Sequence, residues 1–340
     1  MTILISCNIA CAKARSRISL TFPNCTPYHA LTMAISVTRQ TILVIAASIL
    51  LVMSGCSLNT LMVNQMSPML KAALPSLETE EDFEVARDAI PAQLKLLEGF
   101  LESSPNNRHL LELLAQGWGS YAFGFIEDGI EAVKDSDPDR AEVLTIRGRG
   151  LYLRGMNYGL RLLALDDDHF PAVMDQSPEA LEAALQNIND RDLVPALFWA
   201  GFGLAGAVNL GRDQPELIIR LPQIELIFKR VQELDEHFFY AGTHLALGSF
   251  YASRIGLFGG DFEKGRDHFE RAIQLNDTFL MHKVLYAFYY AHQTQNRELF
   301  EQLLTDVVTT PATILPEQRL ANVIAQRRAQ RYLSWADDLF

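Results

Sequence analysis

Three stretches of this chain end in the same way, and this repetition restricts the fold more than any other feature. In each, an amphipathic segment ends at a leucine that directly precedes an acid or amide; the three read GLRLLALDDDHF, IFKRVQELDEHFF and HFERAIQLNDTFL. The leucines are Leu165, Leu234 and Leu275, which are 69 and 41 residues apart. The first spacing is close to two helical hairpins of about 34 residues, and the second to one hairpin with a longer turn. Because such hairpins bury their apolar faces only by stacking, we expect an all-α, tetratricopeptide-like α-solenoid.

Helical periodicity continues through almost every segment after Leu77, in pairs separated by turns. In GGDFEKGRDHFERAIQL (259–275) the apolar residues recur at helical spacing, and Asp261 stands where a helix cap is expected. No strand precedes these glycines and no Lys-Ser/Thr follows them, so they indicate a turn between helices rather than a phosphate loop. The DPD at 137–139 similarly predicts an N-cap followed by a proline in the first helical turn.

The N-terminal region has the pattern of a targeting segment. TILVIAASILLVM (41–53) has the length of a signal-peptide core, follows Arg39 and is followed by SGC. This resembles a bacterial lipoprotein signal, in which Cys56 becomes the lipidated first residue; an uncleaved anchor helix is the alternative. We expect residues 1–55 to be upstream sequence and signal peptide with the true start at Met33, residues 56–76 a lipidated tether running into a first packed segment, and residues 77–340 the all-α domain.

The cysteines and the charge agree with this division. All four cysteines lie at or before Cys56, so the mature chain has no disulfide framework and no thiolate metal site. Removing residues 1–55, which contain four basic residues and no acid, changes the net charge from −12 to −16. Such an acidic surface argues against nucleic acid as a partner, and it leaves membrane attachment to the lipid.

The sequence contains no motif that identifies a cofactor, metal or catalytic site. GFGLAG (201–206) fits G-x-G-x-x-G, but it lies within one helical pattern, so its glycines are expected to let helices approach closely. The scattered histidines form no close ligand pair, and we expect no cofactor and no metal. An all-α hydrolase using Glu112, Glu127 and Asp128 remains a remote alternative. In the last helix, Arg327, Arg328 and Arg331 are interpreted as a solvated face or as partners for the many acids, with a docking patch as the alternative.

Aromatic residues gather on the first helices of the predicted pairs, in GWGSYAFGF, LFWAGF, FFYAGTH and YAFYYAH. In stacked hairpins these helices line the concave surface, and Tyr and Trp suit an amphipathic ligand or a partner surface. Packing between repeats is the alternative for any one of them. The predicted ligand- or partner-binding residues are Trp118, Tyr121, Trp199, Tyr240, His244, Tyr251 and Tyr289.

Four segments resemble the TRAP (tripartite ATP-independent periplasmic) transporter T-component family: LVPALFWAGFGLAGAVNL, LALGSFYASRIGLFGGDFEKGRDHFERAIQL, MHKVLYAFYYAHQTQNRELFEQLL and RLANVIAQRRAQRYLSWADDLF. The resemblance implies a periplasmic lipoprotein with a tetratricopeptide-like fold, a trimeric assembly and ligand-accessible cavities. It also implies association with the substrate-binding protein of a TRAP transporter, and it brings no catalytic motif.

The expected function is therefore that of a non-enzymatic accessory component. It would be anchored in the periplasm through Cys56, dock the substrate-binding protein and hold a small organic or hydrophobic ligand. The alternative is a scaffold lipoprotein for envelope assembly that uses the same repeats for a different partner.

Overall fold

The prediction of an all-α chain is confirmed for the described residues. The computed structural model describes residues 55–254 and 256–340, and each regular element within them is helical. The expected signal segment, apart from its last residue Gly55, lies outside the described residues, as do Cys7, Cys11 and Cys25. Cys56 lies in the first turn of helix α3 (Gly55–Ala73), but its side chain is not described. The residues from Asn59 to Phe340 form one unit, and the following description concerns that unit.

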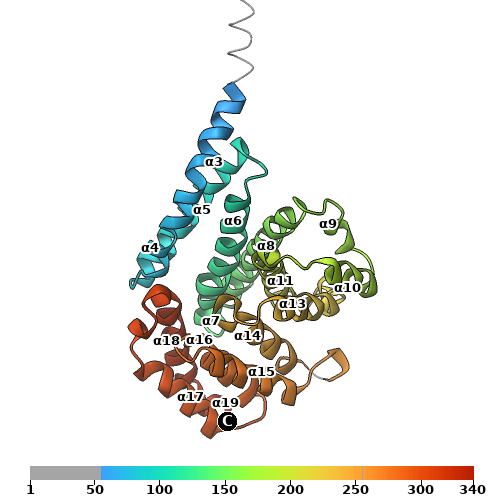
Figure 1. Cartoon of the computed structure of the whole chain (residues 1–340). Coiled ribbons are helices and arrows are strands. Elements are labelled where there is room, and N and C mark those ends of the chain that lie inside the picture. Colours follow the sequence, from blue (N-terminus) through green and yellow to red (C-terminus); the bar gives the residue numbers. More distant parts are fainter. Residues whose placement is uncertain (1–54, 255) are drawn as a thin grey trace, which may run out of the picture. The chain divides into compact units, whose positions relative to one another are not determined.

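The unit is an array of helices joined by short turns (Figure 1). The longer helices are α3 (Gly55–Ala73), α5 (Phe83–Ser103), α6 (Arg108–Tyr121), α7 (Glu127–Val133), α8 (Pro138–Leu163), α10 (Pro178–Asn187), α11 (Val194–Asn209), α13 (Leu221–Leu234), α14 (Phe238–Ala252), α15 (Phe262–Leu275), α16 (Met281–Tyr286), α17 (Arg297–Thr309) and α18 (Arg319–Ser334). Single turns are α4 (Pro75–Glu78), α9 (Phe170–Val173), α12 (Pro215–Ile218) and α19 (Ala336–Leu339). Two π-helical segments, η1 (Ala122–Ile126) and η4 (Ala287–Ala291), continue α6 and α16.

Side-chain caps fix where many of these helices begin. Asp137 accepts a hydrogen bond from the amide of Arg140 with Pro138 in the first turn, as predicted. Asp261 likewise accepts from the amide of Lys264 at the start of α15, which confirms that the glycine stretch is a turn between helices. Each cap satisfies an amide that the first helical turn leaves without an intrahelical partner. The other capping residues are Asp82, Asn107, Ser177 and Asn296.

Glycines allow α8 to pack closely between α6 and α11, as expected for GFGLAG. A Cβ on Gly203 of α11 would lie 2.6 Å from the carbonyl oxygen of Tyr152 and 2.7 Å from the amide nitrogen of Met156. A Cβ on Gly155 of α8 would lie 3.0 Å from the carbonyl oxygen of Ala115 in α6. The helix backbones are therefore nearly in contact, which side chains of ordinary size would prevent.

The stretch that was expected to be a tether is helical as far as Ala73. Val63 and Ser67 of α3 are buried. The Asn64 side-chain oxygen accepts hydrogen bonds from Ser104 Oγ and Asn107 Nδ2, both at 2.7 Å. The part of α3 within the unit thus packs against the turn between α5 and α6.

One helical stretch among the described residues, Arg191–Asn209, has the length and apolar composition to cross a membrane. Within the protein, 67% of its apolar window is buried. It contains α11, which packs against α6, α8 and α13. Its apolar character is accounted for by its place in the core.

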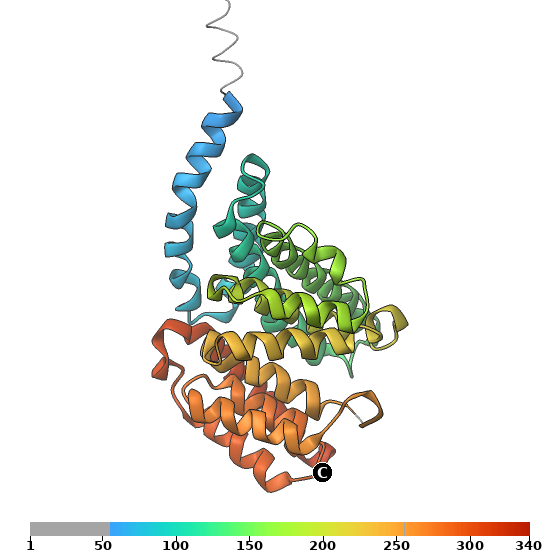
Figure 2. The ribbon, with the colours of Figure 1, turned by 45° about the vertical axis from the view of Figure 1, so that its right-hand side comes forward.

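The last helices of the unit pack against its first helices. The helices α14 and α15 form a close pair, and α17 packs against both η4 and α18. The last long helix, α18, contacts α4 and α5 near the start of the unit, and Figure 2 shows this region of the chain beside those helices. The helices therefore enclose a space instead of forming an open row.

Candidate functional site

A cavity of about 560 Å³ lies among α6–η1, α11, α14, α16–η4 and α18. Its volume falls within the range of roughly 300–1,000 Å³ that is usual for small-molecule sites. Most of its wall is apolar. The part contributed by α14 consists of Phe239, Gly242, Leu245, Ala246, Ser249, Phe250 and Ser253, which follow one helix face.

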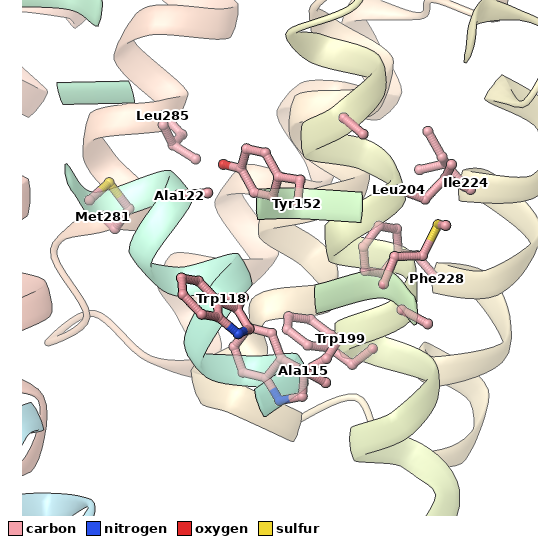
Figure 3. Packing of buried hydrophobic residues seen from close by; sticks show 14 of the residues in the cluster. Ala115, Trp118, Ala122, Tyr152, Trp199, Leu204, Ile224, Phe228, Met281 and Leu285 are labelled. Carbon is pink, nitrogen blue, oxygen red and sulfur yellow. The ribbon is translucent and has the colours of Figure 1, made fainter. Parts of the chain in front are cut away.

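Three of the aromatic residues predicted from the sequence, Tyr121, Trp199 and Tyr289, line this cavity. The Trp199 ring meets Phe239 edge-on at a centroid distance of 4.8 Å. Burial raises the pKa of Tyr289 to about 12, so its phenol stays neutral at physiological pH. Figure 3 shows Trp199 on α11 within the buried cluster from which the wall is built.

Trp118 and Tyr240, which were predicted to share this site, do not line the cavity. Trp118 Nε1 donates to Glu98 Oε1 at 2.9 Å, and the Arg154 guanidinium lies 4.8 Å from the centroid of its ring. The Tyr240 ring stacks on Phe279 at 5.4 Å with an interplanar angle of 2°. Phe279 itself lines the cavity, so Tyr240 lies one side chain behind the wall.

His244 and Tyr251 also lie outside the cavity, because they are on the face of α14 that meets α15. His244 Nδ1 is 2.9 Å from His268 Nδ1, and its Nε2 is 3.1 Å from Glu236 Oε1. The Tyr251 hydroxyl donates to Glu225 at 2.7 Å, and its ring stacks on His268. His244 and Tyr251 are seven residues apart and share a helix face, but this face contacts α15 and not the cavity.

The histidine pair is held in the neutral state. Burial, together with the charge of His244, lowers the pKa of His268 to about 4. Burial also lowers the pKa of His244, against the opposing effect of Glu236. Among the described residues no group of three or more His, Cys, Asp or Glu side chains could hold a metal ion.

The backbone at the start of α14 is strained where it meets the cavity. Phe239, Tyr240 and Ala241 have φ of 47°, 57° and 62°, in the left-handed region that side chains with a Cβ disfavour. Phe239 packs against both Trp199 and Phe279. Strain of this kind persists where surrounding contacts enforce it, often at binding sites, and the π-helical segments η1 and η4 also contribute to the cavity wall.

The cavity wall also contains polar residues that the aromatic pattern did not predict. Glu127 accepts a hydrogen bond from the Tyr152 hydroxyl at 2.5 Å and lies 3.3 Å from Arg328 Nη2. Burial raises the pKa of Glu127. Figure 3 shows the Tyr152 hydroxyl directed toward Ala122 and Leu285. Arg254 also lines the cavity; it has no acid within four positions in the sequence, and that isolation is a signal that could have found it.

The three arginines of α18 are partners for acids, which was one of the two expectations. Arg327 Nε and Arg331 Nη2 bind opposite oxygens of Asp128 at 2.9 and 2.6 Å. Arg328, only 1% exposed, donates to the carbonyl oxygen of Phe123 at 2.9 Å. These bonds join α18 to η1 and α7.

The carboxylates considered for a hydrolase have cation partners. Asp128 is bound by Arg327 and Arg331, and Glu127 lies beside Arg328. Glu112 pairs with Lys71 at 2.6 Å. Each carboxylate therefore has a structural role in holding helices together.

The chain is similar to known proteins over most of its length. The family model described as TRAP transporter T-component matches residues 79–340. An uncharacterized protein of Treponema pallidum (strain Nichols) is 24% identical over 309 residues, covering 85% of this chain and 94% of that protein. The family match begins just before α5 and includes most of the cavity wall, apart from the part that α3 and α4 contribute.

Proposed function

The chain belongs to the TRAP transporter T-component family, and we propose that it docks the substrate-binding protein of such a transporter. The family role implies association with a TRAP transporter system and a periplasmic location. Attachment to the membrane through a lipid on Cys56 and the assembly of three copies belong to the same proposal. The stacked hairpins would supply the docking surface in the manner of tetratricopeptide-like repeats.

The cavity supports a second part of this proposal, that the protein holds a small ligand with a large apolar portion. Tyr121, Trp199 and Tyr289 would contact the ligand, since each contributes an aromatic surface to the wall. A cavity lined mainly by apolar groups, with a few polar groups among them, is the usual form of a small-molecule site. Transport of the ligand would then involve transfer between this cavity and the substrate-binding protein.

The family match over residues 79–340 is the observation that carries the docking proposal. A scaffold for envelope assembly is the second candidate, because helical repeats serve many partners. The hydrolase receives no support from Glu112, Glu127 and Asp128, because cations engage all three.

An affinity pull-down from periplasmic extract of the native cells, with the full chain as bait, distinguishes the first two candidates. We expect a TRAP substrate-binding protein to be recovered in near-equal amount and identified by mass spectrometry. Recovery of envelope-assembly factors in its place would favour the scaffold. Sedimentation equilibrium of the isolated chain would separately measure whether three copies assemble.

A further inference from the structure

The cavity wall includes residues from several turns of both α11 and α14, which constrains what can fill the cavity. Phe198 and Trp199 near the start of α11 contact Phe238 and Phe239 at the start of α14. The two helices therefore begin at the same end of the cavity. The wall residues of α14 extend from Gly242 to Ser253, a helical length of about 16 Å at 1.5 Å per residue.

The end near the start of α14 carries an acid. Glu78 lines the cavity there and accepts a hydrogen bond from Gln116 at 3.3 Å. Burial raises the pKa of Glu78, and no Lys or Arg of the described residues forms an ion pair with it. Together with burial, the charge of Glu78 also helps to raise the pKa of the Tyr240 phenol at the start of α14. This end of the cavity would therefore repel an anion.

The end near the last turn of α14 carries an arginine without a carboxylate partner. Arg254 lies 4.0 Å above the Phe250 ring and donates to the Phe250 carbonyl oxygen. Burial, together with the positive charge of Arg212, lowers the pKa of Arg254 to about 10. The Arg212 side chain bonds to Asn209 Oδ1, at the end of α11, and Asn209 lines the cavity. Within the described part of the chain neither arginine forms an ion pair.

The acids in this neighbourhood are already engaged. Glu127 has Arg328 and the Tyr152 hydroxyl as partners. Glu225, which attracts Arg254 from a distance, is paired with Lys229 at 2.6 Å. Two neighbouring cations are thus uncompensated in a chain whose net charge is −12. Arg254 is half-buried in the cavity wall, whereas Arg212 is exposed and lies outside it, and an anion between the two would offset the repulsion of their like charges.

We propose that the cavity binds an elongated amphipathic anion, with its apolar body along α11 and α14 and a single acidic headgroup at Arg254 and Arg212. The headgroup is a carboxylate or a phosphate monoester, because the planar guanidinium donates two parallel hydrogen bonds to either. Asn209, Ser253 and the neutral Tyr289 phenol supply further polar groups at the cavity wall. This inference rests on the proposed ligand-holding role and gives that ligand a charge and an orientation.

The test compares three probes with the same hydrocarbon chain: dodecanoate, dodecyl phosphate and dodecanol. Their affinities are measured by quenching of tryptophan fluorescence in the full chain held in amphipol, with amphipol alone as the blank. We expect at least one of the two acids to bind tenfold or more tighter than dodecanol. The preferred acid identifies the headgroup as a carboxylate or a phosphate.

The variants Arg254→Gln and Arg212→Gln locate the headgroup. We expect Arg254→Gln to weaken binding of the preferred acid at least tenfold and Arg212→Gln to weaken it severalfold, with dodecanol binding unchanged. Arg140→Gln, which changes an exposed arginine of α8 outside the cavity wall, should leave all three probes unaffected. If Arg254→Gln also loses its binding of dodecanol, the substitution has damaged the fold, and the location of the headgroup is then judged from Arg212→Gln alone.

Two results would overturn the inference. Equal affinity for dodecanol and both acids would show that the cavity does not select a charge. Undiminished acid binding in both arginine variants would place the headgroup elsewhere. If none of the three probes binds, the ligand-holding role itself fails, whereas binding without charge selection removes only the anionic headgroup.

Discussion

Arg328 is the most buried of the three arginines that attach α18 to the first half of the unit. It is 1% exposed, donates to the Phe123 carbonyl oxygen and lies 3.3 Å from Glu127 and 3.9 Å from Glu131. In the variant Arg328→Met, a side chain of similar length fills the space but donates nothing. Glu127 then remains in a buried environment without a cation, whereas Glu131 keeps Arg331 at 2.8 Å.

The size of the effect follows from this burial. Breaking a buried ion pair by removing one partner costs about 3–5 kcal/mol, because the other charge is left uncompensated. Arg327→Met on the same helix is the matched control. The Arg327 side chain is 44% exposed, and its partner Asp128 keeps Arg331 at 2.6 Å. We expect the control to lose no more than about 1 kcal/mol.

Urea unfolding followed by circular dichroism measures both variants, first near pH 7.5 and then at lower pH. Burial already raises the pKa of Glu127, and loss of Arg328 raises it further. Acidification therefore neutralises this carboxylate, so the deficit of Arg328→Met relative to the native protein should shrink as the pH falls. Equal losses in the two variants, or a deficit that grows on acidification, would refute this account of the network.

Three further predictions concern stability. Gly203→Ala should lower the free energy of unfolding by about 1–3 kcal/mol, because the new Cβ would lie 2.6 Å from the Tyr152 carbonyl oxygen. Gly99→Ala, on an exposed helix face with open space around it, should raise the free energy of unfolding by about 0.5–1 kcal/mol. If urea unfolding ranks the two variants in the opposite order, the close packing of α8 and α11 is contradicted. Ala241→Gly should be at least about 1 kcal/mol less destabilising than Ala207→Gly, since only Ala241 has a positive φ; similar losses would remove the strain argument. The pKa of His268 is lowered to about 4 in the folded state, so the unfolded chain binds the proton at a higher pH than the folded protein does. The free energy of unfolding should therefore fall as the pH is lowered from about 6.5 to 4. His268→Gln should make this fall smaller, and an unchanged pH profile would assign the effect to other groups.

The sequence was sufficient to predict the helices, because their signals are local. The caps at Asp137 and Asp261 and the helical spacing of the apolar residues depend only on neighbours in the chain. Close packing at Gly203 could also be predicted, since glycine destabilises a helix interior and several glycines in one helix without a loop signal indicate close contact with neighbouring helices. A solenoid of tetratricopeptide type remains a prediction.

The choice of cavity-lining residues was less accessible, for a physical reason. Both faces of α14 are largely buried, one against the cavity and the other against α15, so apolar and aromatic residues occur on both. Helical periodicity groups residues such as His244 and Tyr251 on one face, but it does not determine which neighbouring helix that face meets. Arg254 was missed because its significance depends on the carboxylates that are absent around it in space.

Binding between this protein and a purified TRAP substrate-binding protein from the same cells tests the central claim most directly. In a sedimentation-velocity titration, we expect a faster species that grows with added binding protein and saturates at a fixed ratio. Arg140→Gln, which changes an exposed side chain outside the cavity, is a suitable control for the integrity of the preparation. Independent sedimentation of the two proteins at every ratio, with each protein folded, would contradict the docking role.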